Sequence, residues 1–210
     1  MNFPVIVLGA GGHAKVLIDI LRLRNISILG VVCPKSNDEY GLNIPWLGED
    51  EILVNYLNQS IRLVNGIGSV KATLKRREIF EKYKKLGFNF SSVIHPSAVI
   101  AADVKLGEGV QIMAGAVLQT GSQIGENTII NTKVSVDHDC IIGAHVHLSP
   151  GVTLSGNVYI GNGTHVGTGA NIIQGIKIGE GSLVGAGGLV IRDVKSKVTV
   201  FGVPAKEILK

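Results

Sequence analysis

The chain carries two patterns of hydrophobic and polar positions, and one gives way to the other near residue 90. Before that point, short apolar runs alternate with amphipathic stretches. PVIVLGAGG, ISILGVVCP and IRLVNGIGS each predict a buried strand that ends in a turn. HAKVLIDILRLR has apolar residues at helical spacing and predicts a helix that packs on Val16, Leu17, Ile20 and Leu21.

A second, strongly charged helix is predicted over KATLKRREIFEKYKKLG, with Ser69 as its N-cap and Gly87 at its end. We interpret the charges of this helix as a solvent-exposed face. The order strand, helix, strand, strand, helix predicts a small parallel sheet. Residues 1–90 are therefore expected to form a Rossmann-like α/β domain that binds the substrate.

From Ile94 onward, every sixth residue is aliphatic, through seventeen positions and without an insertion. Four residues after these anchors, the chain repeatedly has a small or β-branched residue, such as Ala98, Val110 or Cys140. This pattern predicts one short strand per hexad, with two inward-facing side chains. The anchors are Ile94, Ile100, Leu106, Ile112, Leu118, Ile124, Ile130, Val136, Ile142, Leu148, Leu154, Ile160, Val166, Ile172, Ile178, Val184 and Val190.

A longer period is superimposed on the hexads. Glycine follows the anchor at five positions that lie 18 residues apart: Gly107, Gly125, Gly143, Gly161 and Gly179. Three short strands per coil make a triangular prism, so residues 91–195 predict an all-β solenoid around an aliphatic column. Residues 196–210 are expected to form a C-terminal tail.

Composition and charge narrow the function classes. The 210 residues have a formal net charge of +4, a pI of about 9.1 and only 5% aromatic residues, which does not predict a nucleic-acid surface. No apolar run reaches the roughly 20 residues of a membrane span, and no signal peptide is evident. We therefore expect a cytoplasmic protein without a membrane partner. Its two cysteines, Cys33 and Cys140, have no metal-type spacing.

The segment GAGGHA, at residues 9–14, follows the first strand and opens the first helix. Glycines there let the backbone approach an anion, and a helix N-terminus offers free N–H groups. The segment also matches a dinucleotide fingerprint, but Cys33-Pro34 stands where NAD binding needs an acidic residue. The alternatives are a phosphate site, or a tight turn with a helix-capping His13 and no ligand.

The hexads IGENTI, IGNGTH, VGTGAN and IGEGSL resemble those of left-handed β-helix acyltransferases, and FGVPAKEILK is similar to the GxPAK ending of those enzymes. With VLGAGGHAKV at the start, the whole chain resembles one family of sugar acetyltransferases. That family includes sialic acid O-acetyltransferases and the nucleotide-amino-sugar N-acetyltransferases of the bacillosamine and perosamine pathways. The resemblance implies a left-handed parallel β-helix, a homotrimer, acetyl-CoA as cosubstrate and no metal.

The resemblance also implies the site residues. The family's H-[DE]-C segment falls on His138-Asp139-Cys140, with His138 as general base, Asp139 as its partner and Cys140 as an inward filler. Acetyl-CoA is expected to contact His147, Gly167, Thr168, Gly185 and Ala186. The sugar and its phosphates are expected at Gly11, Gly12, His13, Gly68 and Asn131.

The expected reaction needs little besides a base. A thioester is an activated acyl donor, but an amine acceptor is mostly protonated at neutral pH, and histidine can accept the proton. A neighbouring carboxylate can orient the ring. We therefore predict direct acetyl transfer to the amino group of a nucleotide-linked 4-amino-deoxysugar.

The other histidines have predicted positions on the prism. His147 and His165 lie 18 residues apart, so they stack on the outer face, one coil over the next. We interpret His145 and His165 as surface histidines at a subunit interface. Within one subunit, His138 and His147 face different sides, and a trimer could bring such residues together.

Four alternatives remain open at this point. O-acetylation of a sialic-type sugar is the nearest. A zinc-dependent, carbonic-anhydrase-like β-helix protein would use the same histidines and aspartates as metal ligands. A nicotinamide-binding protein would use GAGGHA, and a non-catalytic scaffold would need none of these side chains.

Overall fold

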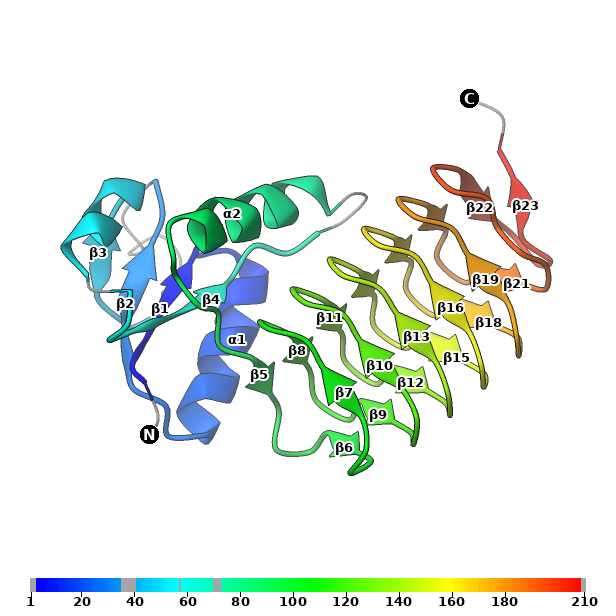
Figure 1. Ribbon diagram of the computed structural model, residues 1–210, viewed down its shortest axis with the longest axis horizontal. Coiled ribbons are helices and arrows are strands. Elements are labelled where there is room, and N and C mark those ends of the chain that lie inside the picture. Colours follow the sequence, from blue (N-terminus) through cyan, green and yellow to red (C-terminus); the bar gives the residue numbers. More distant parts are fainter. Residues whose placement is uncertain (1–2, 35–40, 57, 70–72, 209–210) are drawn as a thin grey trace.

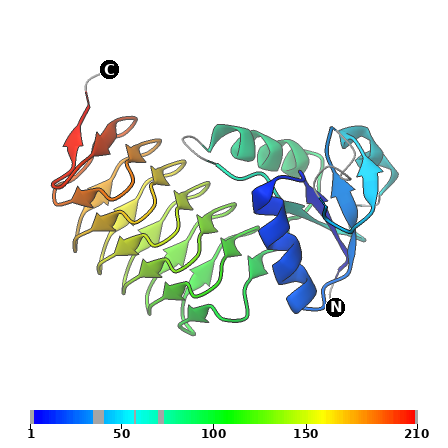
Figure 2. The same ribbon diagram turned by 180° about the vertical axis from the view of Figure 1, so that it is seen from behind.

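The computed structural model describes residues 3–34, 41–56, 58–69 and 73–208. It has two parts, a small α/β domain and a three-sided parallel β-solenoid (Figures 1 and 2). The chain starts in the α/β domain, which covers one end of the solenoid, and reaches the opposite end with its last strands. None of the described helices is long and apolar enough to cross a membrane.

The α/β domain contains a four-stranded parallel sheet in the order β3-β2-β1-β4. Its strands are β1 (Val5–Leu8), β2 (Ile28–Val32), β3 (Trp46–Gly48) and β4 (Arg62–Asn65). Its helices are α1 (Gly12–Leu23), α2 (Leu74–Lys85) and the 3-10 helix η2 (Asp50–Asn55). The small parallel sheet that the sequence predicts is therefore confirmed.

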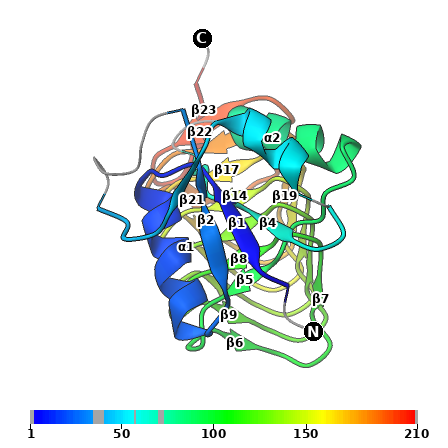
Figure 3. The same ribbon diagram turned by 90° about the vertical axis from the view of Figure 1, so that its left-hand side faces the viewer.

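Alternating residues of β1 divide the core of this domain, because successive side chains of a strand point to opposite faces. Val5 and Val7 pack with α1 and with residues of the first solenoid coils, whereas Ile6 and Leu8 pack with α2 and η2. Figure 3 shows α1 and α2 on opposite sides of the sheet. Helix α1 consequently joins the two parts of the molecule through a shared apolar core.

Two details of α1 differ from the prediction. Val16, expected on the buried face, is exposed, and Ile18 is buried in its place. The buried face is wider than the predicted stripe because both the sheet and the solenoid cover the helix. The helix also starts at Gly12 with Gly11 as its N-cap, so His13 is not a capping residue.

The start of α2 was predicted too early. Thr73 is the N-cap and Leu74 the first helical residue, and the predicted first residues 71–72 lie outside the described part of the chain. Ser69 does not cap the helix. Its hydroxyl contacts the solenoid instead. The predicted end is confirmed, since Gly87 follows the C-cap Leu86 with φ +82°, a conformation that glycine adopts without strain.

The solenoid has three parallel faces, which we name the β5, β6 and β7 faces after their first strands. The β5 face consists of β5 (Val93–Ile94), β8 (Gln111–Ile112), β11 (Ile129–Ile130), β14 (His147–Leu148), β17 (His165–Val166), β20 (Leu183–Val184) and β22 (Thr199–Phe201), with β23 (Lys206–Glu207) added antiparallel. The β6 face consists of β6 (Val99–Ile100), β9 (Val117–Leu118), β12 (Ser135–Val136), β15 (Thr153–Leu154), β18 (Asn171–Ile172) and β21 (Leu189–Val190). The β7 face consists of β7 (Lys105–Leu106), β10 (Gln123–Ile124), β13 (Ile141–Ile142), β16 (Tyr159–Ile160) and β19 (Lys177–Ile178).

The predicted hexad pattern is confirmed. All seventeen anchors belong to one apolar core or pack against it, and Cys140 is fully buried in the same column. Strands pair with a shift of 18 residues, as in the register of Ile130 with Leu148. Because β22 pairs with β20, the solenoid continues beyond residue 195 into the predicted tail.

Two backbone constraints explain the glycines at 18-residue spacing and the residue types at the corners. A side chain at Gly125 would collide with the backbone of Gly143 and Ala144 on the next coil, and the other glycines at 18-residue spacing are equally close to their neighbours. Separately, the corner residue of most hexads has positive φ, a region that glycine, asparagine and aspartate tolerate best. Asp139 and His145 occupy two of these corners, with φ of 58° each.

Candidate active site

The corner between the β6 and β7 faces carries the His138–Asp139 dyad. The imidazole Nδ1 lies 2.8 Å from Asp139 Oδ2, and both side chains are exposed. The hydrogen bond that His138 makes to the Asp139 carboxylate raises the pKa of His138, with a smaller contribution from the charge of Asp137. If Nδ1–H donates to the carboxylate, Nε2 is left with a free lone pair, as a general base requires.

The scaffold holds this dyad in place from three sides. Asp139 takes the left-handed corner conformation, which an aspartate adopts at little cost. Asp137 Oδ1 accepts a hydrogen bond from the backbone N–H of His138 at 2.8 Å. On the next coil, Gly156 lies directly against the ring, since a side chain there would collide with Nε2 and Cε1 of His138. Gly156 was not predicted from the sequence, because it does not belong to the series of glycines at 18-residue spacing.

The β5 face carries two histidines that the α/β domain covers. His147 and His165 are each only 6% exposed, and their strands pair in register, as the 18-residue spacing predicts. Asn131 Nδ2 donates to His147 Nε2 (3.1 Å), so the neutral His147 ring carries its proton on Nδ1 and donates it to Ser69 Oγ (2.7 Å). His165 contacts Ser149 Oγ through Nε2 at 3.2 Å. Burial lowers the pKa of His147 to about 3, helped by His165, His13 and Arg76.

The interpretation of His145 and His165 as surface histidines is wrong for a single chain, because both are 6% exposed. His145 lies under α2, edge-on to Phe80, and accepts a hydrogen bond from Asn127 Nδ2 at 3.0 Å. Burial lowers its pKa to about 4, with a further contribution from Arg77. The hexad pattern correctly placed these residues outside the apolar column, but it could not show that another domain packs on them.

Arg76 is the main polar residue that the sequence interpretation misjudged. Rather than lying on a solvated face, it is 1% exposed and donates to the backbone carbonyls of Asn65, Ile67 and Asn127. Burial lowers its pKa to about 9, and its Nη2 has no hydrogen-bond partner among the described residues. Arg76 therefore ties the turn after β4 to the solenoid.

His13 also bridges the two parts. Its Nε2 lies 2.7 Å from Gln111 Oε1, and Gln111 Nε2 donates to the carbonyl of Asn65. Burial lowers the pKa of His13 to about 4, and the nearby positive charge of Arg76 lowers it further. One ring nitrogen of His13 is thus engaged by the solenoid while the residue lines the cavity described next.

Two adjacent cavities lie where the α/β domain meets the β5 face. The first, of about 530 Å³, is lined by all five residues predicted to bind the sugar and its phosphates: Gly11, Gly12, His13, Gly68 and Asn131. The second, of about 380 Å³, is lined by all five residues predicted to bind acetyl-CoA: His147, Gly167, Thr168, Gly185 and Ala186. Ser69, Asn131 and His147 line both cavities, so the two spaces meet at these side chains.

The dyad and the cavities lie at different corners of the solenoid. Asn131 lies between β11 and β12, on the corner of the β5 and β6 faces, whereas His138 lies between β12 and β13, on the next corner. His138 and Asp139 line neither cavity. Within one chain, the structure therefore does not bring His138 together with His147.

Neither a metal cluster nor a reactive cysteine stands out among the described residues. No group of three histidine, cysteine or acidic side chains in this part of the chain could hold a metal ion. Cys140 points into the column, its thiol donates to the carbonyl of Ser155, and burial raises its pKa.

Family models match both parts of the chain. The model of the PglD N-terminal domain matches residues 4–83, and the model of the bacterial transferase hexapeptide (six repeats) matches residues 121–156. Among curated proteins, UDP-N-acetylbacillosamine N-acetyltransferase of Bacillus subtilis is 38% identical over 110 residues, 52% of this chain and 51% of that protein. The matched part of the chain thus spans about half the length of this relative.

Solved structures match the chain over its whole length. A histidine variant of perosamine N-acetyltransferase from Caulobacter crescentus, in complex with CoA and GDP-perosamine, is 39% identical, with a TM-score of 0.92 over 100% of this chain and 99% of that one. The acetyltransferase domain of PglB from Neisseria gonorrhoeae, in complex with acetyl coenzyme A, is 34% identical, with a TM-score of 0.89 over 99% and 100%. The chain belongs to the family of left-handed β-helix sugar N-acetyltransferases that carry a PglD-type N-terminal domain.

Proposed function

We propose that this protein transfers the acetyl group of acetyl-CoA to the amino group of a nucleotide-linked 4-amino-deoxysugar. The observation that carries the proposal is the junction of the two cavities at Ser69, Asn131 and His147. One cavity opens at the N-terminus of α1, where free backbone N–H groups suit phosphates. The other is lined by small residues of successive coils, which leave room for the extended pantetheine arm.

In the proposed reaction, the sugar amine attacks the thioester carbonyl and the C–S bond breaks. His138 Nε2 takes a proton from the amine, and Asp139 stabilises the resulting imidazolium. The CoA sulfur leaves as thiolate and takes that proton from the His138 imidazolium, which regenerates the base. No covalent enzyme intermediate is involved. His147, which is neutral and hydrogen-bonded on both nitrogens, positions the donor and does not serve as a base.

The complete site in this proposal requires a homotrimer. Because His138 and the cavities lie at different corners of the solenoid, His138 of one subunit would serve the cavities of its neighbour. A mixing experiment tests this arrangement. His138→Ala and Thr168→Trp trimers should each be inactive, and mixed trimers should regain part of the activity. Failure to regain activity in verified mixed trimers would contradict the shared site.

The reaction itself is tested by thiol release from acetyl-CoA. The acceptors are GDP- and UDP-linked 4-amino-deoxysugars and free nonulosonic acids. We expect release with a nucleotide-linked amino sugar, and mass spectrometry should find the acetyl group on nitrogen. Release with nonulosonic acids alone would favour O-acetylation of a sialic-type sugar.

A further inference from the structure

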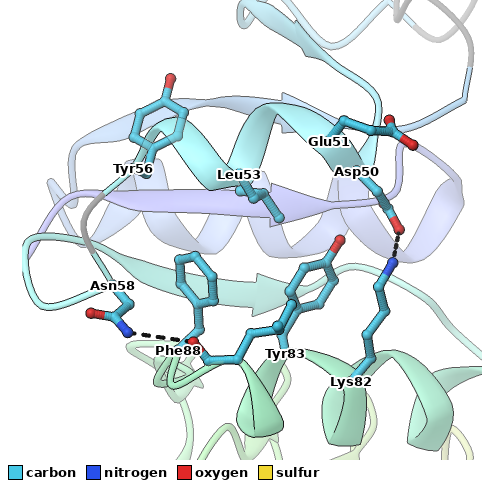
Figure 4. Close-up of a pocket in the computed structure, with 9 residues that line it drawn as sticks. Asp50, Glu51, Leu53, Tyr56, Asn58, Lys82, Tyr83 and Phe88 are labelled. Atoms are coloured by element: carbon cyan, nitrogen blue, oxygen red, sulfur yellow. Dashed lines mark hydrogen bonds and ion pairs between the residues drawn. The ribbon is translucent and has the colours of Figure 1, made fainter.

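The polar side chains that line a cavity can pair with one another or leave a hydrogen-bonding group for a ligand. In the cavity of about 500 Å³ between η2 and α2, Lys82 Nζ pairs with Asp50 Oδ2 at 2.6 Å (Figure 4). Asn58 Nδ2 donates to the carbonyl of Leu86 at 3.4 Å. The cavity of about 380 Å³ on the β5 face differs, because its polar side chains form one continuous chain of hydrogen bonds. In order, they are Asn131, His147, Ser69, His165 and Ser149.

The direction of this chain is fixed at Asn131. The backbone N–H of Thr132 donates to Asn131 Oδ1 at 2.8 Å, so Nδ2, which can only donate, is the group that meets His147. His147 Nε2 is therefore the acceptor, and the neutral ring carries its proton on Nδ1. That N–H donates to the Ser69 hydroxyl oxygen at 2.7 Å.

The second histidine carries its proton on the other nitrogen. Since the Ser69 oxygen accepts from His147, its O–H donates to His165 Nδ1 at 3.4 Å, and the described residues offer it no other acceptor. Burial lowers the pKa of His165, so this ring is also neutral and has a single N–H. The proton of His165 therefore lies on Nε2, which donates to Ser149 Oγ at 3.2 Å.

The last hydroxyl of the chain is left with a free O–H. Ser149 is 4% exposed and lines the same cavity as the residues predicted to bind acetyl-CoA. Its oxygen accepts from His165, and its own O–H has no acceptor among the described residues. Buried donors almost always have a partner, so this one indicates a missing acceptor. Acetyl-CoA has carbonyl oxygens in its thioester and in the amides of its pantetheine arm.

We propose that Ser69 is a positioning residue for acetyl-CoA, which acts through His165 to direct the Ser149 hydroxyl to a carbonyl oxygen of the donor. This inference rests on the proposed function. Without the Ser69 O–H, nothing holds the His165 proton on Nε2. Ser149 can then donate to that nitrogen, which turns its O–H away from the ligand. Because Ser69 follows Gly68 and lines both cavities, one turn of the α/β domain serves sugar and donor alike.

Calorimetric titration with acetyl-CoA tests this role on two variants of the same shape. Ser69→Val has no hydroxyl and fills the space that a water would need, whereas Ser69→Thr keeps the hydroxyl. We expect Ser69→Val to bind acetyl-CoA about fivefold more weakly than Ser69→Thr, as the loss of one neutral hydrogen bond predicts. Equal binding by the two variants would overturn the proposal.

The control is a serine–histidine pair elsewhere on the solenoid. The Ser97 hydroxyl lies 2.8 Å from Nδ1 of His95, and neither residue lines the two ligand cavities. Ser97→Ala should therefore bind acetyl-CoA like the parent protein. A loss equal to that of Ser69→Val would remove the special role of Ser69.

A double substitution shows whether Ser69 acts through Ser149. Ser149→Ala should weaken acetyl-CoA binding by about the same factor as Ser69→Val, about fivefold. Adding Ser69→Val to Ser149→Ala should then cost nothing more, because both changes act on one hydroxyl. Two losses that multiply would contradict the chain.

The tautomers of the two histidines can be read without a ligand. Proton–nitrogen correlation spectra of protein labelled with nitrogen-15 histidine should place the proton of His147 on Nδ1 and that of His165 on Nε2. His147→Gln and His165→Gln identify the two sets of signals. The same tautomer on both rings would overturn the proposed direction of the chain.

These measurements separate the inference from the proposed function. If Ser69→Val and Ser69→Thr differ in acetyl-CoA binding but no amino sugar accepts acetyl, the proposed function fails and the positioning role stands. If acetyl transfer occurs and the two variants bind acetyl-CoA alike, the positioning role fails alone.

Discussion

His138 and His147 lie half a coil apart in the same solenoid, yet their environments shift their pKa values in opposite directions. His138 lies on an uncovered corner beside Asp139, whose hydrogen bond raises its pKa. His147 lies on the face that the α/β domain covers, and burial lowers its pKa to about 3. The raised pKa of His138 suits a general base, whereas the lowered pKa of His147 keeps that ring neutral, as a hydrogen-bonding group.

The comparison shows how a monotonous scaffold acquires different chemistry at different positions. Both histidines point away from the apolar column, so the solenoid itself treats them alike. What differs is the second domain, which buries the β5 face and leaves the corner of the β6 and β7 faces open to solvent or to another subunit. The α/β domain thus determines which solenoid histidines are buried and which remain exposed.

The largest expected effect comes from removing the exposed ring. His138→Gln should lower kcat/KM for acetyl transfer by roughly 10²- to 10⁴-fold, because the general base is lost. The melting temperature should stay unchanged, since the side chain is exposed. Steady-state thiol release and a thermal melt check this. Full activity of His138→Gln would show that His138 is not the general base.

Gly156→Ala should displace the same ring without removing it. The added methyl group would collide with Nε2 and Cε1 of His138, and a displacement of about 1 Å can cost about 100-fold in rate. Because the ring is exposed and can move, folding should be unaffected. Ser155→Ala, on the adjacent residue, is the control and should keep its activity. An active Gly156→Ala protein would mean that the position of the ring is not critical.

Asp139→Asn should make His138 more like an ordinary histidine. Loss of the carboxylate lowers the His138 pKa toward its usual value, so the acidic limb of the kcat/KM profile should move to lower pH. We also expect about a tenfold loss of rate, because the amide supports the imidazolium less well. Asparagine tolerates the left-handed corner, so the fold should persist. An unchanged pH profile would contradict the role of Asp139.

Two buried histidines should make the stability of the fold depend on pH. His13 and His145 have folded-state pKa values of about 4, below the ordinary value of 6.5, so the unfolded chain binds more protons as the pH falls between these values. Stability should therefore decrease from pH 6.5 toward pH 4. Thermal melts at pH 7 and pH 5 should show a smaller difference for His145→Gln. His138→Gln should not reduce the difference, because the raised pKa of His138 acts in the opposite direction. A melting temperature that does not change with pH would disprove the assignment.

Much of the architecture was predictable because it depends on local periods. The hexad anchors, the inward Cys140 and the outward His138 all follow from side-chain alternation along short strands, which sequence spacing records directly. The two sets of ligand residues came from family resemblance, and each set lines one cavity.

Other features could not be predicted, because they depend on contacts between distant segments. Arg76 is one of many charged residues in its helix. It is buried only because α2 packs against the turn after β4 and the corner at Asn127, where Arg76 donates hydrogen bonds to backbone carbonyls. Ser69 was expected to cap that helix but bonds to His147 instead. Neither outcome leaves a local pattern in the sequence.

By itself, the sequence determined the repeat, its aliphatic column and the corner that presents His138 and Asp139, since each depends on residues a few positions apart. Only the tertiary structure decided which solenoid histidines are buried and where the two ligand cavities meet. The physical reason is that a pKa or a cavity is set by what surrounds a side chain, and those surroundings come from remote parts of the chain.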